Sequence, residues 1–332
     1  MREASFYEQD GNTVQCHLCP RGCTITSGRR GACGTRKNID GTLYAATYGK
    51  PCSMAVDPIE KKPLYHFLPG SRVFSIATEG CNLFCKWCQN AAISHPEHEE
   101  PYVPYGEVSP EEVVRLCKRE VCDLLAFSCT EPSVFYEYML DTAKLAKKEG
   151  IRTVMISNGY LNKEPLEELV PYLDAANIDL KAFTDKAYLH WTSAQLQPVL
   201  DTLERLHQHK VHLEITTLVV PGVNDDEEQL KGMYGWVKEH LGEEQVVHIS
   251  RFFPSYKVKD KEPTPHETLE RAKKIAEERI NHVYVGNVGA AEETRCPSCG
   301  KVLVERSFMG VTSHVNQDGT CSCGQRIPGT WS

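Results

Sequence analysis

Short apolar runs alternate with amphipathic segments through the middle of the chain. Candidate strands lie at residues 73–78, 124–128, 153–157, 177–180, 212–220, 246–251 and 282–285, and several of them are apolar nearly throughout, as is typical of parallel strands covered on both faces. Segments with a helical pattern lie at residues 110–119, 133–148, 165–173, 196–209, 227–240 and 268–278. This order predicts an α/β fold with a partial or full βα (TIM-like) barrel, although an open doubly wound sheet would have the same spacing.

The two ends of the chain lack this repeat and carry cysteine groups instead. We therefore predict three parts: an amino-terminal cysteine-rich module at residues 1–65, the barrel at 66–290 and a carboxyl-terminal four-cysteine module at 291–332. In a βα barrel the chemistry takes place at the carboxyl ends of the strands. The residues just after each apolar run are therefore the candidates for a functional site.

The 332-residue chain has an ordinary globular composition and a net charge of −8. This charge argues against a protein that binds nucleic acid mainly by electrostatics. The longest apolar stretches, such as residues 215–220, are too short to cross a membrane, and the polar first residues do not resemble a secretory signal. We therefore expect a cytoplasmic protein with no membrane association and no nucleic-acid partner.

Fifteen cysteines are present, and most of them fall into three tight groups, two near the ends of the chain and one just after the first apolar run. Each group contains cysteines that are separated by only one to three residues. In a cytoplasmic chain such spacing indicates metal ligands rather than disulfides.

The central group consists of Cys81, Cys85 and Cys88. Three thiolates at this spacing can wrap one compact metal centre, and a [4Fe–4S] cubane bound by only three cysteines keeps one iron open to another ligand. The alternative is a zinc site with a remote fourth ligand such as His95.

This triplet resembles the CxxxCxΦC signature of the radical S-adenosylmethionine (SAM) superfamily, with Trp87 at the aromatic position. The resemblance implies that Cys81, Cys85 and Cys88 hold a catalytic [4Fe–4S] cluster and that Trp87 lies near the adenine of SAM. It also implies reductive cleavage of SAM to a 5′-deoxyadenosyl radical, which abstracts hydrogen from a substrate. The cluster and SAM are then the cofactors.

Further segments at strand ends agree with the family pattern. The resemblance implies SAM contacts for the polar residues there, which are Glu131, Ser157, Asn158, Asp179, Lys181 and His248. Each has an ordinary structural alternative: a helix-start carboxylate for Glu131, a plain turn for the Asn-Gly pair, a surface ion pair for Asp179 and Lys181, and a core histidine for His248.

The terminal groups predict two more metal sites. In the carboxyl-terminal module, two knuckles resemble a zinc ribbon and predict a structural zinc site with the ligands Cys296, Cys299, Cys321 and Cys323. The amino-terminal group fits either zinc or an auxiliary [4Fe–4S] cluster, and its members are Cys16, Cys19, Cys23 and Cys33.

Longer segments, including residues 57–70, resemble the radical SAM enzyme of the AmmeMemoRadiSam system, a branch related to pyruvate formate-lyase activating enzymes. This resemblance implies Memo-like and Ammecr-like partner proteins, an electron donor such as a ferredoxin or flavodoxin, and a reaction of the glycyl-radical-activase type on a protein or small molecule. Two alternatives remain: an RNA-modifying radical SAM enzyme that uses the basic residues of the amino-terminal module, and a non-catalytic zinc scaffold.

Overall fold

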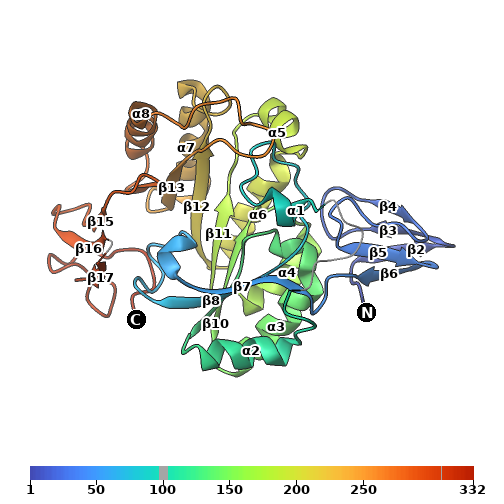
Figure 1. Ribbon diagram of the computed structural model, residues 1–332. Coiled ribbons are helices and arrows are strands. Elements are labelled where there is room, and N and C mark those ends of the chain that lie inside the picture. Colours follow the sequence, from blue (N-terminus) through green and yellow to red (C-terminus); the bar gives the residue numbers. More distant parts are fainter. Residues whose placement is uncertain (97–103, 308) are drawn as a thin grey trace.

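The computed structural model describes residues 1–96, 104–307 and 309–332, and a large sheet forms its centre (Figure 1). The eight strands follow one another in the order β14-β13-β12-β11-β10-β9-β8-β7. All pairs from β8 to β14 are parallel, whereas β7 is antiparallel to β8. The bounds are β7 Pro51–Pro58, β8 Arg72–Thr78, β9 Leu124–Phe127, β10 Arg152–Ser157, β11 Ala175–Asp179, β12 His212–Val219, β13 Val246–Arg251 and β14 His282–Gly286. The seven strands predicted from the apolar runs are confirmed.

The edge strands β7 and β14 do not pair with each other, so among the described residues the sheet is a partial barrel and not a closed one. The strand β7 belongs to this sheet, although the cysteine pattern places residues 51–58 in the amino-terminal module. The prediction of an α/β partial barrel is therefore confirmed.

Helices connect the parallel strands, as a right-handed βα repeat requires. Their bounds are α1 Ala91–Ser94, α2 Pro110–Arg119, α3 Tyr136–Lys148, α4 Lys163–Leu169, α5 Asp185–Thr192, α6 Gln197–Gln208, α7 Glu227–Leu241 and α8 His266–Glu277, with short 3₁₀ turns at Ile59–Lys61, Pro132–Phe135 and Val170–Tyr172. The local sequence determines where α2 begins. The Ser109 side chain accepts a hydrogen bond from the backbone N–H of Glu112, and Pro110 occupies the first turn. Within the described ranges, no helix combines the length and apolar character that a membrane crossing needs.

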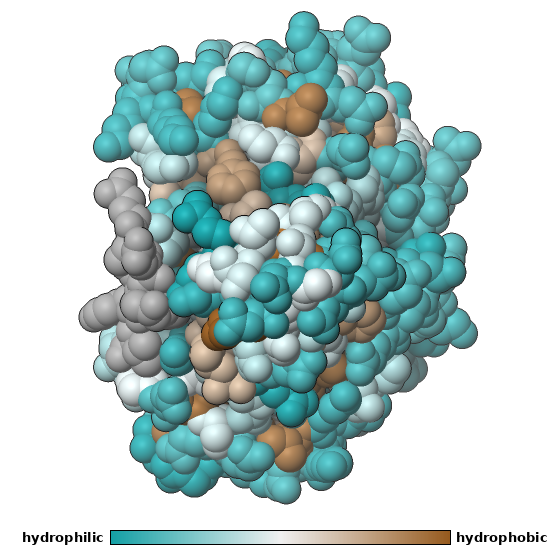
Figure 2. Space-filling model, turned by 90° about the vertical axis from the view of Figure 1, so that its right-hand side faces the viewer, coloured by the Kyte–Doolittle hydropathy of each residue, from teal (hydrophilic) through white to brown (hydrophobic). Residues whose placement is uncertain are grey.

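Small antiparallel sheets stand at both ends of the chain, at opposite sides of the barrel in Figure 1. The amino-terminal sheets contain β1 Arg2–Glu3, β2 Tyr7–Asp10, β3 Thr13–Cys16, β4 Thr24–Thr26, β5 Arg36–Ile39 and β6 Thr42–Ala45. The carboxyl-terminal sheet contains β15 Glu292–Arg295, β16 Val302–Ser307 and β17 Gly310–Ser313. Figure 2 shows the face with the amino-terminal sheets, where hydrophobic residues are scattered over a mostly hydrophilic surface.

Candidate active site

The loop after β8 carries the central cysteines at the carboxyl end of the first parallel strand. Neighbouring segments hold its backbone: Phe84 N–H donates to Thr192 O at 2.8 Å, and Lys86 N–H donates to Trp191 O at 3.0 Å. Both acceptors lie at the end of α5. Trp87 is almost fully buried, and its ring centroid lies 5.8 Å from that of Trp191. The end of α5 therefore fixes the shape of the cysteine loop.

A cavity of about 470 Å³ lies next to this loop, over the carboxyl ends of the strands. It brings together all of the predicted central-site residues except His248, namely Cys81, Cys85, Trp87, Cys88, Glu131, Ser157, Asn158, Asp179 and Lys181. These residues come from the ends of four successive parallel strands, where the chemistry of βα barrels takes place. The cavity is the candidate active site.

Glu131 holds the part of the cavity lining that lies next to Cys81. Its carboxylate is buried and accepts hydrogen bonds from the Ser133 N–H at 3.0 Å, the Ser157 hydroxyl at 2.7 Å and the Asn158 N–H at 2.8 Å. Burial raises the pKa of Glu131, although these hydrogen bonds lower it in part. The carboxylate therefore holds the residues after β10 in place, because it satisfies their backbone and hydroxyl donors.

Asn158 reaches from this wall to the cysteine loop. Its side-chain amide donates to Asn82 Oδ1 at 2.9 Å and lies 3.7 Å from Cys81 Sγ. Asn82 in turn donates to Tyr160 O at 2.7 Å. These contacts join the ends of β8 and β10 beside the first cysteine.

Asp179 and Lys181 place a pair of opposite charges on the cavity floor, with Lys181 Nζ 3.0 Å from Asp179 Oδ2. Burial lowers the pKa of Lys181, but Asp179 and Cys85 outweigh it, so that the net pKa lies above its usual value. Burial also raises the pKa of Cys85 to about 11, and the nearby Lys181 opposes this rise. The lysine is thus a cation that faces one of the cysteines.

Residues before the first parallel strand also line the cavity, which the strand-end rule did not predict. Lys62 is 5 % exposed and contacts Asp57 at 2.8 Å and the Ser128 hydroxyl at 3.3 Å. Asp57 also pairs with the exposed Lys61 at 2.8 Å, and both residues line the same cavity. The sequence did contain a sign of these residues, because the charged run Asp57-Pro-Ile-Glu-Lys-Lys is part of the resemblance to the AmmeMemoRadiSam branch. That resemblance did not assign a role to the run.

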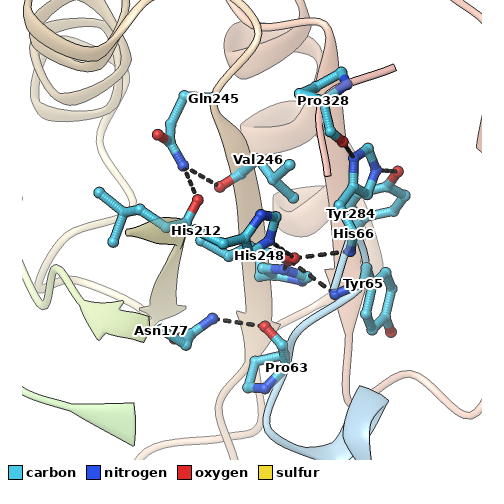
Figure 3. Close-up of polar contacts among 12 residues, drawn as sticks. Pro63, Tyr65, His66, Asn177, His212, Gln245, Val246, His248, Tyr284 and Pro328 are labelled. Carbon is cyan, nitrogen blue, oxygen red and sulfur yellow. Dashed lines mark hydrogen bonds and ion pairs between the residues drawn. The ribbon is translucent and has the colours of Figure 1, made fainter. Parts of the chain in front are cut away.

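His248 lies away from this cavity. Figure 3 shows it beside Tyr65 and His66, and its Nε2 is 2.5 Å from Glu214 Oε2. Ser250, two residues further along β13 on the same face, lines the cavity instead. The histidine therefore contacts a buried carboxylate toward the amino ends of the strands, whereas the resemblance places it near SAM.

The spacing of the cysteine sulfurs indicates what each group can hold. Among the described residues, one group of three or more Cys, His, Asp or Glu side chains has all its ligand atoms within 4.8 Å of one another, and it is Cys296, Cys299, Cys321 and Cys323. A mononuclear tetrahedral site needs such short spacing, whereas the thiolates of a cubane each bind a different iron and lie further apart. Within the described ranges the central triplet lacks this single-ion spacing, which agrees with cysteines that each bind a different iron.

A comparison with known families and proteins agrees with this geometry. Residues 75–232 match the family model described as the radical SAM superfamily. An uncharacterized protein of Methanocaldococcus jannaschii is 46 % identical over 98 % of this chain and 99 % of its own length. The chain belongs to the radical SAM superfamily. The pyruvate formate-lyase 1-activating enzyme of Escherichia coli K12 is 24 % identical over 63 % of this chain and 90 % of that enzyme, so this radical SAM protein is distantly related to glycyl-radical activating enzymes.

A solved structure supports the fold of this radical SAM protein. The crystal structure of Streptococcus suis SuiB bound to precursor peptide SuiA superposes with a TM-score of 0.50 at 15 % identity, over 69 % of this chain and 51 % of SuiB. At this identity the likeness concerns the fold alone. The family implies a [4Fe–4S] cluster and SAM as cofactors, and the three thiolates and the cavity beside them fit that pair.

The carboxyl-terminal group fits a single metal ion. Cys296 Sγ lies 3.6 Å from Cys323 Sγ, and Cys299 Sγ lies 3.7 Å from Cys321 Sγ. A zinc ion about 2.3 Å from each thiolate places tetrahedral sulfurs about 3.8 Å apart. The four cysteines predicted as one site are therefore brought together at the spacing of a four-thiolate metal centre.

Proposed function

We propose that this radical SAM protein cleaves SAM reductively and uses the resulting radical to abstract hydrogen from a protein or small-molecule substrate. The observation that carries the proposal is the cavity of about 470 Å³, which has three cysteines on one side and Glu131, Asn158, Asp179 and Lys181 around it. When bound there, the reduced [4Fe–4S] cluster supplies the electron that splits a carbon–sulfur bond of SAM. The surrounding side chains bind and orient the reactants.

Each wall of the cavity offers a suitable contact for SAM. The charges of Lys181 and Asp179 complement the carboxylate and ammonium of the methionine part. Trp87 offers an aromatic surface for the adenine, and Asn158 is held by Glu131 with its amide close to Cys81. Fixed polar groups of this kind position a bound reactant without reorganising when it binds.

The finer assignment is to the AmmeMemoRadiSam branch, with a reaction of the activating-enzyme type. It is supported by the residues quoted for that resemblance, by the identity to pyruvate formate-lyase 1-activating enzyme, and by the position of residues 57–62 beside the cavity. As part of this assignment we propose Memo-like and Ammecr-like partner proteins, a ferredoxin or flavodoxin as electron donor, and a cytoplasmic location. At the carboxyl-terminal cysteines we place a structural zinc ion.

Anaerobic reconstitution with iron and sulfide, followed by dithionite and SAM, tests the proposed chemistry. The wild-type protein should form 5′-deoxyadenosine, whereas Cys81→Ala should form none. Cys117→Ser is the matched control, because Cys117 is buried away from the cavity and a hydroxyl can keep its contacts with Cys122 O and Leu124 O. Equal 5′-deoxyadenosine from wild type and Cys81→Ala would refute the proposal.

A further inference from the structure

The four amino-terminal cysteines surround one small cavity. Cys16, Cys19, Cys23 and Cys33 all line it, together with Arg36. Cys16 lies at the end of β3, and its N–H donates to Cys23 O at 2.9 Å, which brings these two cysteines side by side. A sulfur-lined centre therefore exists in the fold, although the cysteines are spread over 18 positions of the sequence.

The spacing of these sulfurs differs from that of the carboxyl-terminal site. No three of them come within 4.8 Å of one another, since the only described group that does so is the one at Cys296. The same holds for the central triplet, Cys81, Cys85 and Cys88. The amino-terminal group thus lacks the close spacing of a single-ion site, as does the central triplet, where the family implies a cubane.

Arg36 provides an independent observation. Its side chain is 1 % exposed, and its Nη1 lies 3.5 Å from Cys16 Sγ while Nη2 pairs with Glu137. Its Nε and the Oε2 of its partner Glu137 both lack a hydrogen-bond partner within the described part of the chain. Because Arg36 also lines the sulfur cavity, its buried N–H groups can donate to an acceptor atom held there. The inorganic sulfides of an iron–sulfur cluster supply such acceptors, whereas a zinc ion adds none to the thiolates.

From these observations we propose that Cys16, Cys19, Cys23 and Cys33 hold a second [4Fe–4S] cluster. The open space between them is about 10 Å³, less than a cubane occupies, so binding a cubane would require the thiolates to shift outward. Of the four cysteines, Cys19, Cys23 and Cys33 are only partly buried.

The second cluster would lie close to the first. A Cβ atom on Gly80, the residue before Cys81, would stand 2.6 Å from Cys33 O, so the two cysteine loops are in direct contact. Cys33 also lines a neighbouring cavity of about 480 Å³, and Ser94 lines both that cavity and the candidate active site. Two paramagnetic clusters in this arrangement should interact magnetically.

The test uses the full chain with the triple substitution Cys81→Ala, Cys85→Ala and Cys88→Ala, which removes the central ligands and leaves the amino-terminal group intact. After anaerobic reconstitution, wild type should contain about eight iron and eight sulfide per chain, and the triple variant about four of each, with about one zinc in both. The reduced wild type should show an electron paramagnetic resonance signal broadened by coupling, and the triple variant a simple signal of one cluster.

The result that overturns the proposal is a triple variant with no iron and about two zinc ions per chain. Arg36→Met provides a second readout, since loss of its N–H donors should shift the reduction potential of the cluster in the triple variant. Glu137→Gln is its matched control, because it removes the ion pair and leaves the guanidinium in place. An unchanged potential in Arg36→Met would contradict the assigned contact with the cluster.

These outcomes are independent of the proposed function. If the reaction with SAM is wrong, wild type forms no 5′-deoxyadenosine but the triple variant still holds about four iron. If only the second cluster is wrong, wild type forms 5′-deoxyadenosine with about four iron and the triple variant holds none.

Discussion

Glu214 Oε2 lies 2.5 Å from His248 Nε2 inside the barrel, toward the ends of the strands opposite to the cysteine loop. The Glu214 carboxylate also contacts His212 Nε2 at 2.9 Å. It accepts hydrogen bonds from the backbone N–H groups of Tyr65 and His66 at 2.9 and 2.8 Å. Burial raises the pKa of Glu214, but these two histidines outweigh it, and the net pKa lies well below its usual range. One fully buried carboxylate therefore holds the backbone of Tyr65 and His66, which lie beside His248 in Figure 3.

Glu214→Gln should destabilise the protein strongly. The amide keeps one acceptor oxygen but presents an NH₂ group to donors that the carboxylate satisfied, and breaking a buried charged network of this kind costs about 3 kcal/mol or more. We expect a lower midpoint in thermal and urea unfolding, measured by circular dichroism. Glu239→Gln, at an exposed position on α7, is the control and should leave the midpoint within error. Equal midpoints for both variants would show that the network adds nothing to stability.

His66 should make stability depend on pH in mildly acidic solution. Burial lowers its pKa well below the usual value, while its ring contacts Pro328 O at 2.7 Å and the Tyr284 hydroxyl at 2.6 Å. The unfolded chain binds a proton at His66 below pH ~6.5 and the folded chain does not, so the free energy of unfolding falls as the pH decreases from there. Glu214, whose folded pKa is lowered, adds a further loss below pH ~4.3.

The measurement is the urea midpoint between pH 7.5 and 5.5. His66→Gln should flatten the slope of stability against pH by up to about 1.4 kcal/mol per pH unit. His314→Gln, at an exposed position, should keep the wild-type slope, and any loss of metal in acid affects both variants alike. A slope that is the same in the two variants would exclude His66 as the titrating group.

The sequence predicted the strands because residues covered on both faces are mostly apolar, and residues 124–127, which are Leu-Leu-Ala-Phe and all buried, carry that signal locally. It also predicted Glu131, Asn158 and Lys181 as neighbours, since parallel strands end at one edge of the sheet. Lys62 could not be placed in this way, because its position depends on the pairing of β7 with β8. His248 was misplaced for a different reason. The alternation of side chains along β13 puts it on the same face as Ser250, but it does not tell how far along the strand the cavity begins.

Lys181→Met should slow the formation of 5′-deoxyadenosine while leaving the iron content unchanged. The substitution keeps the length of the side chain but removes the cation that lies 3.0 Å from Asp179 and faces Cys85. A loss of one charge contact with a reactant corresponds to about tenfold or more in rate. Lys186→Met, on the exposed side of α5, is the control. Wild-type rates in Lys181→Met would remove this lysine from the site.

Gly80→Ala should impair the loop that carries Cys81. Gly80 has φ +106°, and an added Cβ would meet Cys33 O at 2.6 Å and Thr35 Cγ2 at 2.4 Å, so both backbone strain and a collision oppose it. Gly150→Ala is the control, since its φ of +73° is also positive but an added Cβ would meet open space. We expect Gly150→Ala to cost about 1 kcal/mol of stability and to keep full iron content. Gly80→Ala should lower the melting temperature further and reduce the iron bound after reconstitution, because the collision moves the loops of Cys33 and Cys81 apart. Equal iron content in the two variants would mean that the contact between these loops does not shape the cluster site.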